Sequence, residues 1–282
     1  MGSHDPWTEV GDRVFVRRYR TWNAEPFDQN VGAVLGADGV AVIDTRGSHR
    51  LADEVLEELR SLTHSPVVAV VNTHHHWDHA WGNARFVPAP IWGHVRCAER
   101  VLADSEAVRR RILDEEPGLA DELGEVIFVP PERTFLDAAG LDLGDRQLEL
   151  RHLGRGHTDN DVVIAAPDAG VLFAGDLLEN DAAPGFGDAY PIAWAETARR
   201  LLALVTGPVV PGHGSVGDSA FVTRQAADLA ALAGLAGQVA AGAIDAAEAV
   251  RRSPFPAGIT GTALERARLE LAGDPAVAEG RS

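Results

Sequence analysis

The sequence predicts an α/β fold in which two β-rich halves pack face to face and helices cover the outside. In the first half, apolar strand patterns at residues 40–43 and 67–71 flank a helical pattern, which makes a strand–helix–strand unit. In the second half, short apolar segments separated by turn residues lead to another helix and a strand at 209–210. The chain has 282 residues, of which 45% are hydrophobic, so it can bury a substantial core.

The first half begins with alternating apolar segments that are typical of strands. They lie at residues 14–16, 31–35 and 40–43. Ala37-Asp38-Gly39 predicts a hairpin turn between the last two. Ser48 is a suitable N-cap for a helix that ends near Leu62, before the buried strand 67–71. Further on we expect a short helix at 80–86, a strand at 91–93, a helix at about 94–115 and a strand at 125–129.

The second half contains four short strand patterns followed by a helical pattern. The strands lie at residues 141–143, 147–151, 162–165 and 171–174, and the helix at about 192–205. From residue 219 the chain is rich in alanine and has helical periodicity, and no flexible spacer precedes it. We therefore expect one domain over residues 1–218 and a C-terminal helical extension over residues 219–282 that packs on it.

Composition narrows the possible partners and compartments. The net charge is −17 and every basic residue is arginine, which disfavours nucleic acid and anionic membranes as partners. The single cysteine, Cys97, cannot form a disulfide within the chain. No apolar run approaches the ~20 residues of a membrane helix, and the N-terminus lacks the apolar stretch of a signal peptide. We expect a cytoplasmic protein that acts on a small molecule; its oligomeric state stays open.

The stretch from Thr73 to His79 holds the residues around which the chain is organised. Four imidazoles and a carboxylate follow the predicted strand 67–71 within six residues, and both groups are preferred ligands of zinc and similar ions. A loop at a strand end can turn several of them toward one point. We interpret His74, His76, Asp78 and His79 as metal ligands. A tag or a solvated loop is the alternative, but a tag would sit at a terminus.

Three later candidates lie at the edges of predicted strands, each beside a glycine. They are His157 in Gly156-His157-Thr158, Asp176 after Gly175, and His213 in Gly212-His213-Gly214. Each alone would more often be a structural residue. Together with the histidine stretch they make seven nitrogen and oxygen ligands without cysteine, which suits two metal ions with open positions for water better than one closed structural zinc.

These motifs, in this order, resemble the metallo-β-lactamase superfamily, and the match extends from about Val31 to Gly214. The resemblance implies an αββα sandwich of two mixed sheets flanked by helices. It implies one metal held by His74, His76 and His157, a second held by Asp78, His79 and His213, and Asp176 as the bridging ligand. Asp44, after the strand 40–43, would orient the motif loop. β-Lactamases with a cysteine ligand carry that cysteine where Asp176 stands, so the pattern is more like the bridging-aspartate hydrolases.

The implied activity is a dinuclear hydrolase. Two Zn²⁺ ions, with iron or manganese as alternatives, would lower the pKa of a bridging water toward ~7. The resulting hydroxide would attack an ester, lactone, thioester or amide carbonyl, β-lactams included. Asp78 and Asp176 are the candidates for orienting the nucleophile or moving its proton. The alternatives are a mononuclear iron oxygenase of the persulfide dioxygenase kind and a metal-binding protein without catalysis.

Aromatic side chains near the motifs are candidates for the substrate pocket, with core packing as the alternative. They are Trp22, Trp77, Phe186 and Tyr190.

Overall fold

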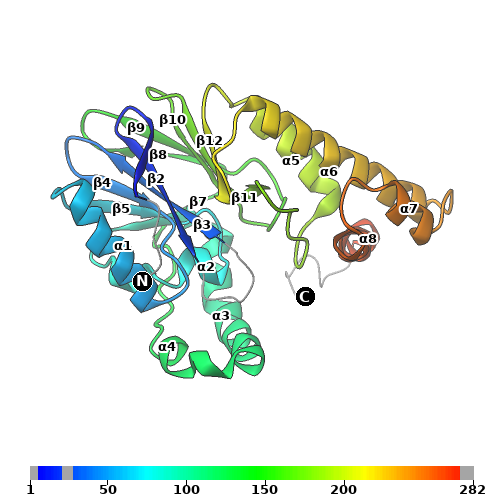
Figure 1. Ribbon diagram of the computed structural model, residues 1–282, viewed down its shortest axis with the longest axis horizontal. Coiled ribbons are helices and arrows are strands. Elements are labelled where there is room, and N and C mark those ends of the chain that lie inside the picture. The colour runs from blue at the N-terminus through cyan, green and yellow to red at the C-terminus, as the bar shows by residue number, and fades with distance from the viewer. Residues whose placement is uncertain (1–5, 21–27, 274–282) are drawn as a thin grey trace.

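The computed structural model describes residues 6–20 and 28–273, and its strands form two groups (Figure 1). The first group runs, in order of pairing, through β7 (Arg133–Phe135), β6 (Ile91–His94), β5 (Val67–Val71), β4 (Val40–Ile43) and β3 (Asp28–Leu35), with β2 (Val14–Arg20) and β1 (Thr8–Gly11) beside β3. The second runs through β12 (Val209–His213), β11 (Val171–Glu179), β10 (Val163–Ala166), β9 (Gln147–Arg151) and β8 (Ala138–Asp142).

The two groups meet where β3 pairs with β12. The register between these strands is a single antiparallel pair, His213 opposite Gln29. On one side of the junction β4, β5, β6 and β7 are parallel neighbours. On the other side β11 and β12 are parallel too. Parallel neighbours end at the same edge of a sheet, so this mixed arrangement brings several strand ends to one region of the molecule.

The main core lies between the two strand groups. Val34 and Val71 of the first group share one buried cluster with Leu148, Leu150 and Phe173 of the second. β9 shows how the sequence produces this packing, because its residues alternate strictly between buried leucine and exposed polar side chains. The predicted face-to-face packing of two β-rich halves is therefore confirmed.

Helices cover the two outer faces. α1 (His49–Leu62) begins at Ser48, whose hydroxyl accepts a hydrogen bond from the Leu51 N–H at 3.2 Å, and packs Val55 and Leu59 against the first group. On the other face lie α5 (Pro191–Leu202), α6 (Ser219–Ala240) and α8 (Ala257–Ala272), with α7 (Ala246–Arg252) between the last two. Helices α6 and α8 contribute to the same core cluster as β11; the domain boundary at residue 218 stays a prediction.

The helices next to the motif loop belong to the first half. They are α2 (Trp77–Ala80), α3 (Val95–Glu115) and α4 (Ala120–Gly124). None of the helices in the described ranges combines the length and apolar character needed to cross a membrane.

Two predicted elements were wrong. Residues 125–129 form no strand; the edge strand is β7, which pairs with β6. Val126 and Phe128 of that segment instead pack on Trp81, and the following Pro130-Pro131 supplies no backbone N–H for a ladder. The short helix expected at 80–86 is replaced by α2, which begins inside the histidine stretch, and a 3₁₀ turn at Asn83–Arg85.

Candidate metal centre

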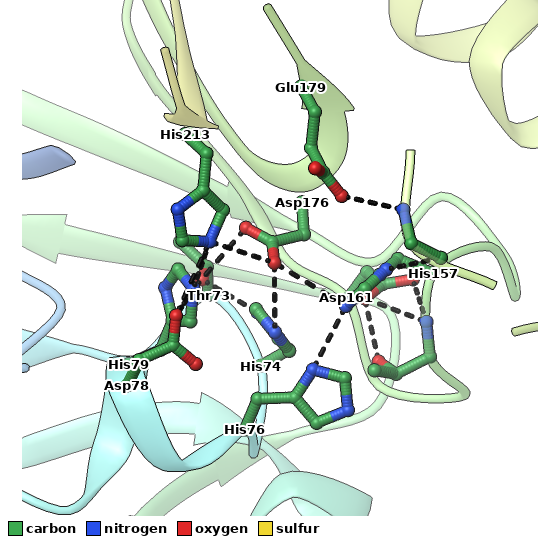
Figure 2. A network of polar contacts seen from close by, with 12 residues as sticks. Thr73, His74, His76, Asp78, His79, His157, Asp161, Asp176, Glu179 and His213 are labelled. Carbon is green, nitrogen blue, oxygen red and sulfur yellow. Dashed lines mark hydrogen bonds and ion pairs between the residues drawn. The ribbon is translucent and has the colours of Figure 1, made fainter. Parts of the chain in front are cut away.

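The predicted ligand residues come together at the junction of the two strand groups (Figure 2). The histidine loop follows β5, and Asp78 and His79 lie in α2. Asp176 lies within β11, and His213 is the last residue of β12. His157 comes from the loop between β9 and β10. Residues more than a hundred positions apart therefore present their polar atoms to one buried place.

A first group of possible ligands consists of His74, His76, His157 and Asp176. One nitrogen or oxygen atom of each lies within 4.8 Å of the others. Nδ1 of His76 is 2.9 Å from Nε2 of His157. Oδ2 of Asp176 is 3.4 Å from Nε2 of His157 and 3.7 Å from Nε2 of His74. Three imidazoles and one carboxylate surround a common point, which is a donor set suited to a divalent cation.

A second group lies beside the first and consists of Asp78, His79 and His213. Oδ2 of Asp78 is 3.3 Å from Nε2 of His79 and 3.3 Å from Nε2 of His213. Asp176 faces this group as well, because its Oδ1 is 3.3 Å from His79 Nε2 and its Oδ2 is 3.3 Å from His213 Nε2. The Asp176 carboxylate therefore lies between the two groups.

Two buried atoms in this cluster make no hydrogen bond to any residue that the structure describes. They are Nε2 of His74 and Oδ1 of Asp176, and both residues are almost inaccessible to solvent. A buried polar atom without a partner is costly, whereas a cation would satisfy both atoms. Gly212 leaves the space that the carboxylate occupies, since a Cβ at this position would lie 1.8 Å from Asp176 Oδ1. The residues present therefore fit a pair of divalent ions.

Outer hydrogen bonds fix which ring nitrogen of each histidine faces the cluster. His157 Nδ1 donates to the carbonyl of Gly185 at 3.1 Å, and His213 Nδ1 donates to the carbonyl of Asp28 at 2.9 Å. Because a carbonyl can only accept, Nδ1 of each ring carries a proton, and Nε2 is the nitrogen that faces the cluster.

Asp44 does the same for the start of the motif loop. Its Oδ2 is 2.8 Å from His79 Nδ1 and accepts from the Thr73 hydroxyl at 2.8 Å, while its Oδ1 accepts from the Thr73 N–H at 2.8 Å. The Thr73 hydroxyl also lies 3.1 Å from His74 Nδ1. Asp44 has a φ of +64°, an uncommon backbone conformation that turns its carboxylate toward the loop.

A sequence model of the metallo-β-lactamase superfamily matches residues 24–213, which is more than half of the chain and includes every residue of both groups. The chain belongs to the metallo-β-lactamase superfamily. The resemblance predicted from the motifs is thus confirmed, and so is the αββα fold that it implies.

Relatives in this superfamily include enzymes with different substrates. The chain is 28% identical to human acyl-coenzyme A thioesterase MBLAC2, over 82% of this chain and 88% of that protein. It is 26% identical to a metallo-β-lactamase type 2 of Bacillus sp. (strain 170), over 71% of this chain and 72% of that protein. Among solved structures, a metallo-β-lactamase from Pontibacter korlensis aligns with a TM-score of 0.65 at 24% identity, covering 81% of this chain and 99% of that one.

Burial and neighbouring charges set the protonation of the histidines and of Asp176 in the two ligand groups. Burial lowers the pKa of His74 well below its usual value and that of His157 to about 4, which leaves both rings neutral and able to ligate. Burial alone would raise the pKa of Asp176, but the nearby histidines hold it well below its usual range. Burial lowers the pKa of His213 less than Asp176 and Asp78 raise it, so it reaches about 10. A cation entering the second group would therefore release protons.

One residue of the site was missed from the sequence. Asp188, in the loop between β11 and α5, has its Oδ2 3.1 Å from His76 Nε2, which leaves His76 Nδ1 for the first group. A single aspartate in a loop more than a hundred residues from the motif carries no spacing signal. His75 lies outside both groups; it forms a third possible ligand set with His76 and Asp188, and its Nδ1 is 2.9 Å from Nδ2 of Asn160.

Three of the aromatic residues predicted for the substrate pocket pack against other side chains of the protein. Phe186 is buried against Trp194 and Phe255, with ring centroids 5.2 and 5.7 Å away. Tyr190 is also buried, beneath the Arg155 guanidinium. Trp77 packs with Trp81 in an apolar cluster. Phe186 and Tyr190 are thus buried by packing, and their assignment to the substrate pocket stays a prediction. Trp22 lies outside the described residues.

Proposed function

We propose that this chain is a dinuclear metal-dependent hydrolase that cleaves an ester, lactone, thioester or amide bond in a small molecule. The observation that carries the proposal is the position of the Asp176 carboxylate, which has oxygen atoms within 3.3 to 3.4 Å of His157 in one ligand group and of His79 and His213 in the other. A carboxylate between two such groups suits two ions that share a ligand better than a single ion.

The ligand sets of the two proposed ions follow from the two groups. His74, His76 and His157 would hold one ion, Asp78, His79 and His213 the other, and Asp176 both. Zn²⁺ is the proposed metal because the donors are nitrogen and oxygen atoms without a thiolate. When bound, the ions would act as Lewis acids that activate water and polarise the substrate carbonyl.

The chain's own carboxylates would handle the proton in this reaction. Asp78 and Asp176 are both buried, and the neighbouring histidines hold the pKa of each well below its usual range, so both are ionised. We assign them to orienting the attacking water or moving its proton. The surrounding imidazoles, fixed by carbonyl and carboxylate partners, keep this geometry unchanged during the reaction.

Thioesters are the first substrate class to test. The similarity to human acyl-coenzyme A thioesterase MBLAC2 spans more of both proteins than the similarity to the metallo-β-lactamase of Bacillus sp. (strain 170). A β-lactam amide is the second candidate, supported by that second similarity. Both are carbonyl compounds, so the same constellation of residues would serve either.

The decisive experiment removes and restores the metal while hydrolysis is followed. Protein stripped with a chelator is expected to be inactive toward acyl-coenzyme A thioesters, lactones and β-lactams, and Zn²⁺ is expected to restore cleavage of one class. Asp78→Ala should abolish that turnover and bind less metal. Glu106→Ala, a surface carboxylate in α3, is the control and should behave as wild type. Hydrolysis that persists in stripped protein or in Asp78→Ala would contradict the proposal.

A further inference from the structure

The C-terminal helix α8 reaches the loop that carries Asp188, although it lies beyond the residues matched by the superfamily. The side chain of Arg266, in the middle of α8, is buried, with the whole residue 4% exposed. Its Nη2 donates to the carbonyl of Asp188 at 2.8 Å, and its Nε donates to the carbonyl of Ala189 at 3.2 Å. A buried guanidinium needs hydrogen-bond partners, and these two carbonyls fix its position relative to the loop.

A second side chain of α8 holds the next part of the same segment. The carboxylate of Glu270 accepts from the N–H groups of Ile192 and Ala193, at 2.8 and 3.0 Å. These N–H groups belong to the first turn of α5, where no intrahelical acceptor is available. Glu270 lies one helical turn after Arg266, so both side chains lie on the same face of α8. Together they hydrogen-bond to the backbone of residues 188–193.

Residues 188–193 include Asp188, whose carboxylate contacts the candidate ligand His76. The Asp188 carboxylate lies 3.1 Å from His76 Nε2. The other nitrogen of that ring, Nδ1, lies in the first ligand group, 2.9 Å from His157 Nε2. A series of contacts therefore runs from α8 through the backbone and carboxylate of Asp188 to His76.

We propose that Arg266 is a positioning residue for the first metal ion, acting through Asp188 and His76. This inference rests on the proposed function, because it assumes that the first group binds an ion. The hydrogen bonds of Arg266 described above run to the backbone carbonyls of Asp188 and Ala189. Its role is to hold residue 188 where its carboxylate keeps the His76 ring turned toward the group, an effect that outer hydrogen-bond partners of metal ligands generally exert. The C-terminal extension is then part of the metal centre.

The test compares two arginines on the same helix. Arg266→Ala removes the hydrogen bonds to the carbonyls of Asp188 and Ala189. Arg268→Ala, two residues further on, removes an exposed side chain that pairs with Glu265. Metal-stripped wild type and both variants are titrated with Zn²⁺ by calorimetry. Arg266→Ala is expected to weaken one of the two binding events about 10- to 100-fold and leave the other unchanged. Arg268→Ala should match wild type. The weakened event is assigned by comparison with His76→Ala, which removes a ligand of the first group, and Asp78→Ala, which removes one of the second.

Coupling separates positioning from simple packing. In a variant that already carries Asp188→Asn, Arg266→Ala should cause little additional loss of affinity, because both changes act through His76. Equal weakening of both binding events, or fully additive losses, would assign Arg266 to packing and overturn the inference. If Arg266→Ala does not fold, Arg266→Gln, which keeps one amide donor, is titrated in the same way and judged by the same criteria.

The outcomes for the inference and for the proposed function are distinct. A wild-type chain that binds no ion would overturn the proposed function and this inference with it. A wild type that binds two ions, together with an Arg266→Ala variant that binds both with unchanged affinity, would overturn this inference alone.

Discussion

Oδ2 of Asp44 lies 2.8 Å from Nδ1 of His79, and both side chains are buried. This pair connects the end of β4 with the first turn of α2 and leaves His79 Nε2 facing the second ligand group. The same carboxylate accepts both polar hydrogens of Thr73, so one side chain holds the two ends of the motif loop.

Replacing Asp44 tests this arrangement. Asp44→Asn retains the size of the side chain but loses the charge and one acceptor oxygen. The side chain at position 44 can then no longer accept all three hydrogen bonds. We expect the affinity for the ion of the second group to fall about 10- to 100-fold, measured by Zn²⁺ titration of stripped protein. Asp53→Asn, an exposed residue that pairs with Arg85, is the control. Unchanged affinity in Asp44→Asn would show that the loop is held by other contacts.

Neighbouring histidines provide a second prediction. His74 and His75 differ by one position, but only His74 has a buried Nε2 without a hydrogen bond in the first group. His74→Ala should therefore lose one metal equivalent, and His75→Ala should retain both. Metal content after gel filtration, measured by plasma mass spectrometry, distinguishes the two variants. Loss of an equivalent from His75→Ala would mean that the ligands are assigned to the wrong histidines.

The candidate ligand residues could be identified from the sequence because they carry local signals. Four of the seven lie in one short stretch after a predicted strand, and each of the other three stands beside a glycine at the edge of a predicted strand. The structure brings all seven together at the junction of β3 and β12. The fold class followed from the strand–helix–strand unit of the first half and from the short strand patterns of the second.

Other features could not be predicted because they depend on packing between distant segments. Asp188 and Arg266 have no motif spacing, and their roles appear only when α8 lies against the loop before α5. The apolar residues of 125–129 resemble a strand, yet their side chains pack on Trp81 while β7 takes the sheet edge. Phe186 and Tyr190 are aromatic residues in or next to a loop near the motifs, but the sequence does not show that Phe186 is buried against Trp194 and Phe255 or that Tyr190 is buried beneath Arg155.

The space beside Asp176 gives a third prediction. Gly212→Ala would place a methyl group on Oδ1 of that carboxylate, so the carboxylate must move away from both ligand groups. We expect loss of metal binding and a lower free energy of unfolding. Gly234→Ala, in α6 with nothing near its Cβ position, is the matched control and should stabilise the protein by about 0.5–1 kcal/mol. Full metal content in Gly212→Ala would contradict the position assigned to Asp176.

Replacing Phe186 distinguishes a role in packing from a role in substrate binding. Phe186→Ala removes a buried ring from the cluster with Trp194 and Phe255, and large-to-small changes of this kind cost about 3–5 kcal/mol. We expect such a loss in urea unfolding of stripped protein. Phe86→Ala, in the cluster beneath α1, is the comparison and should show a similar loss. A large rise in KM without loss of stability in Phe186→Ala would instead place its ring in the substrate pocket.

Bound metal should also stabilise the fold. An ion that binds only the folded state adds about 2.7 kcal/mol at a free concentration of 100 times its dissociation constant. Wild-type protein should therefore unfold at a higher temperature with Zn²⁺ than after chelation, in thermal scans at fixed protein concentration. Asp176→Ala, which lacks the carboxylate shared by both groups, should show little of this difference. An equal shift in that variant would mean that Zn²⁺ acts at another site.

The metal content of gently purified wild-type protein tests the central claim most directly. Plasma mass spectrometry is expected to find close to two zinc ions per chain, one for each ligand group that shares Asp176. Close to one iron per chain would contradict the dinuclear hydrolase and favour the mononuclear oxygenase chemistry, and no bound metal would contradict both.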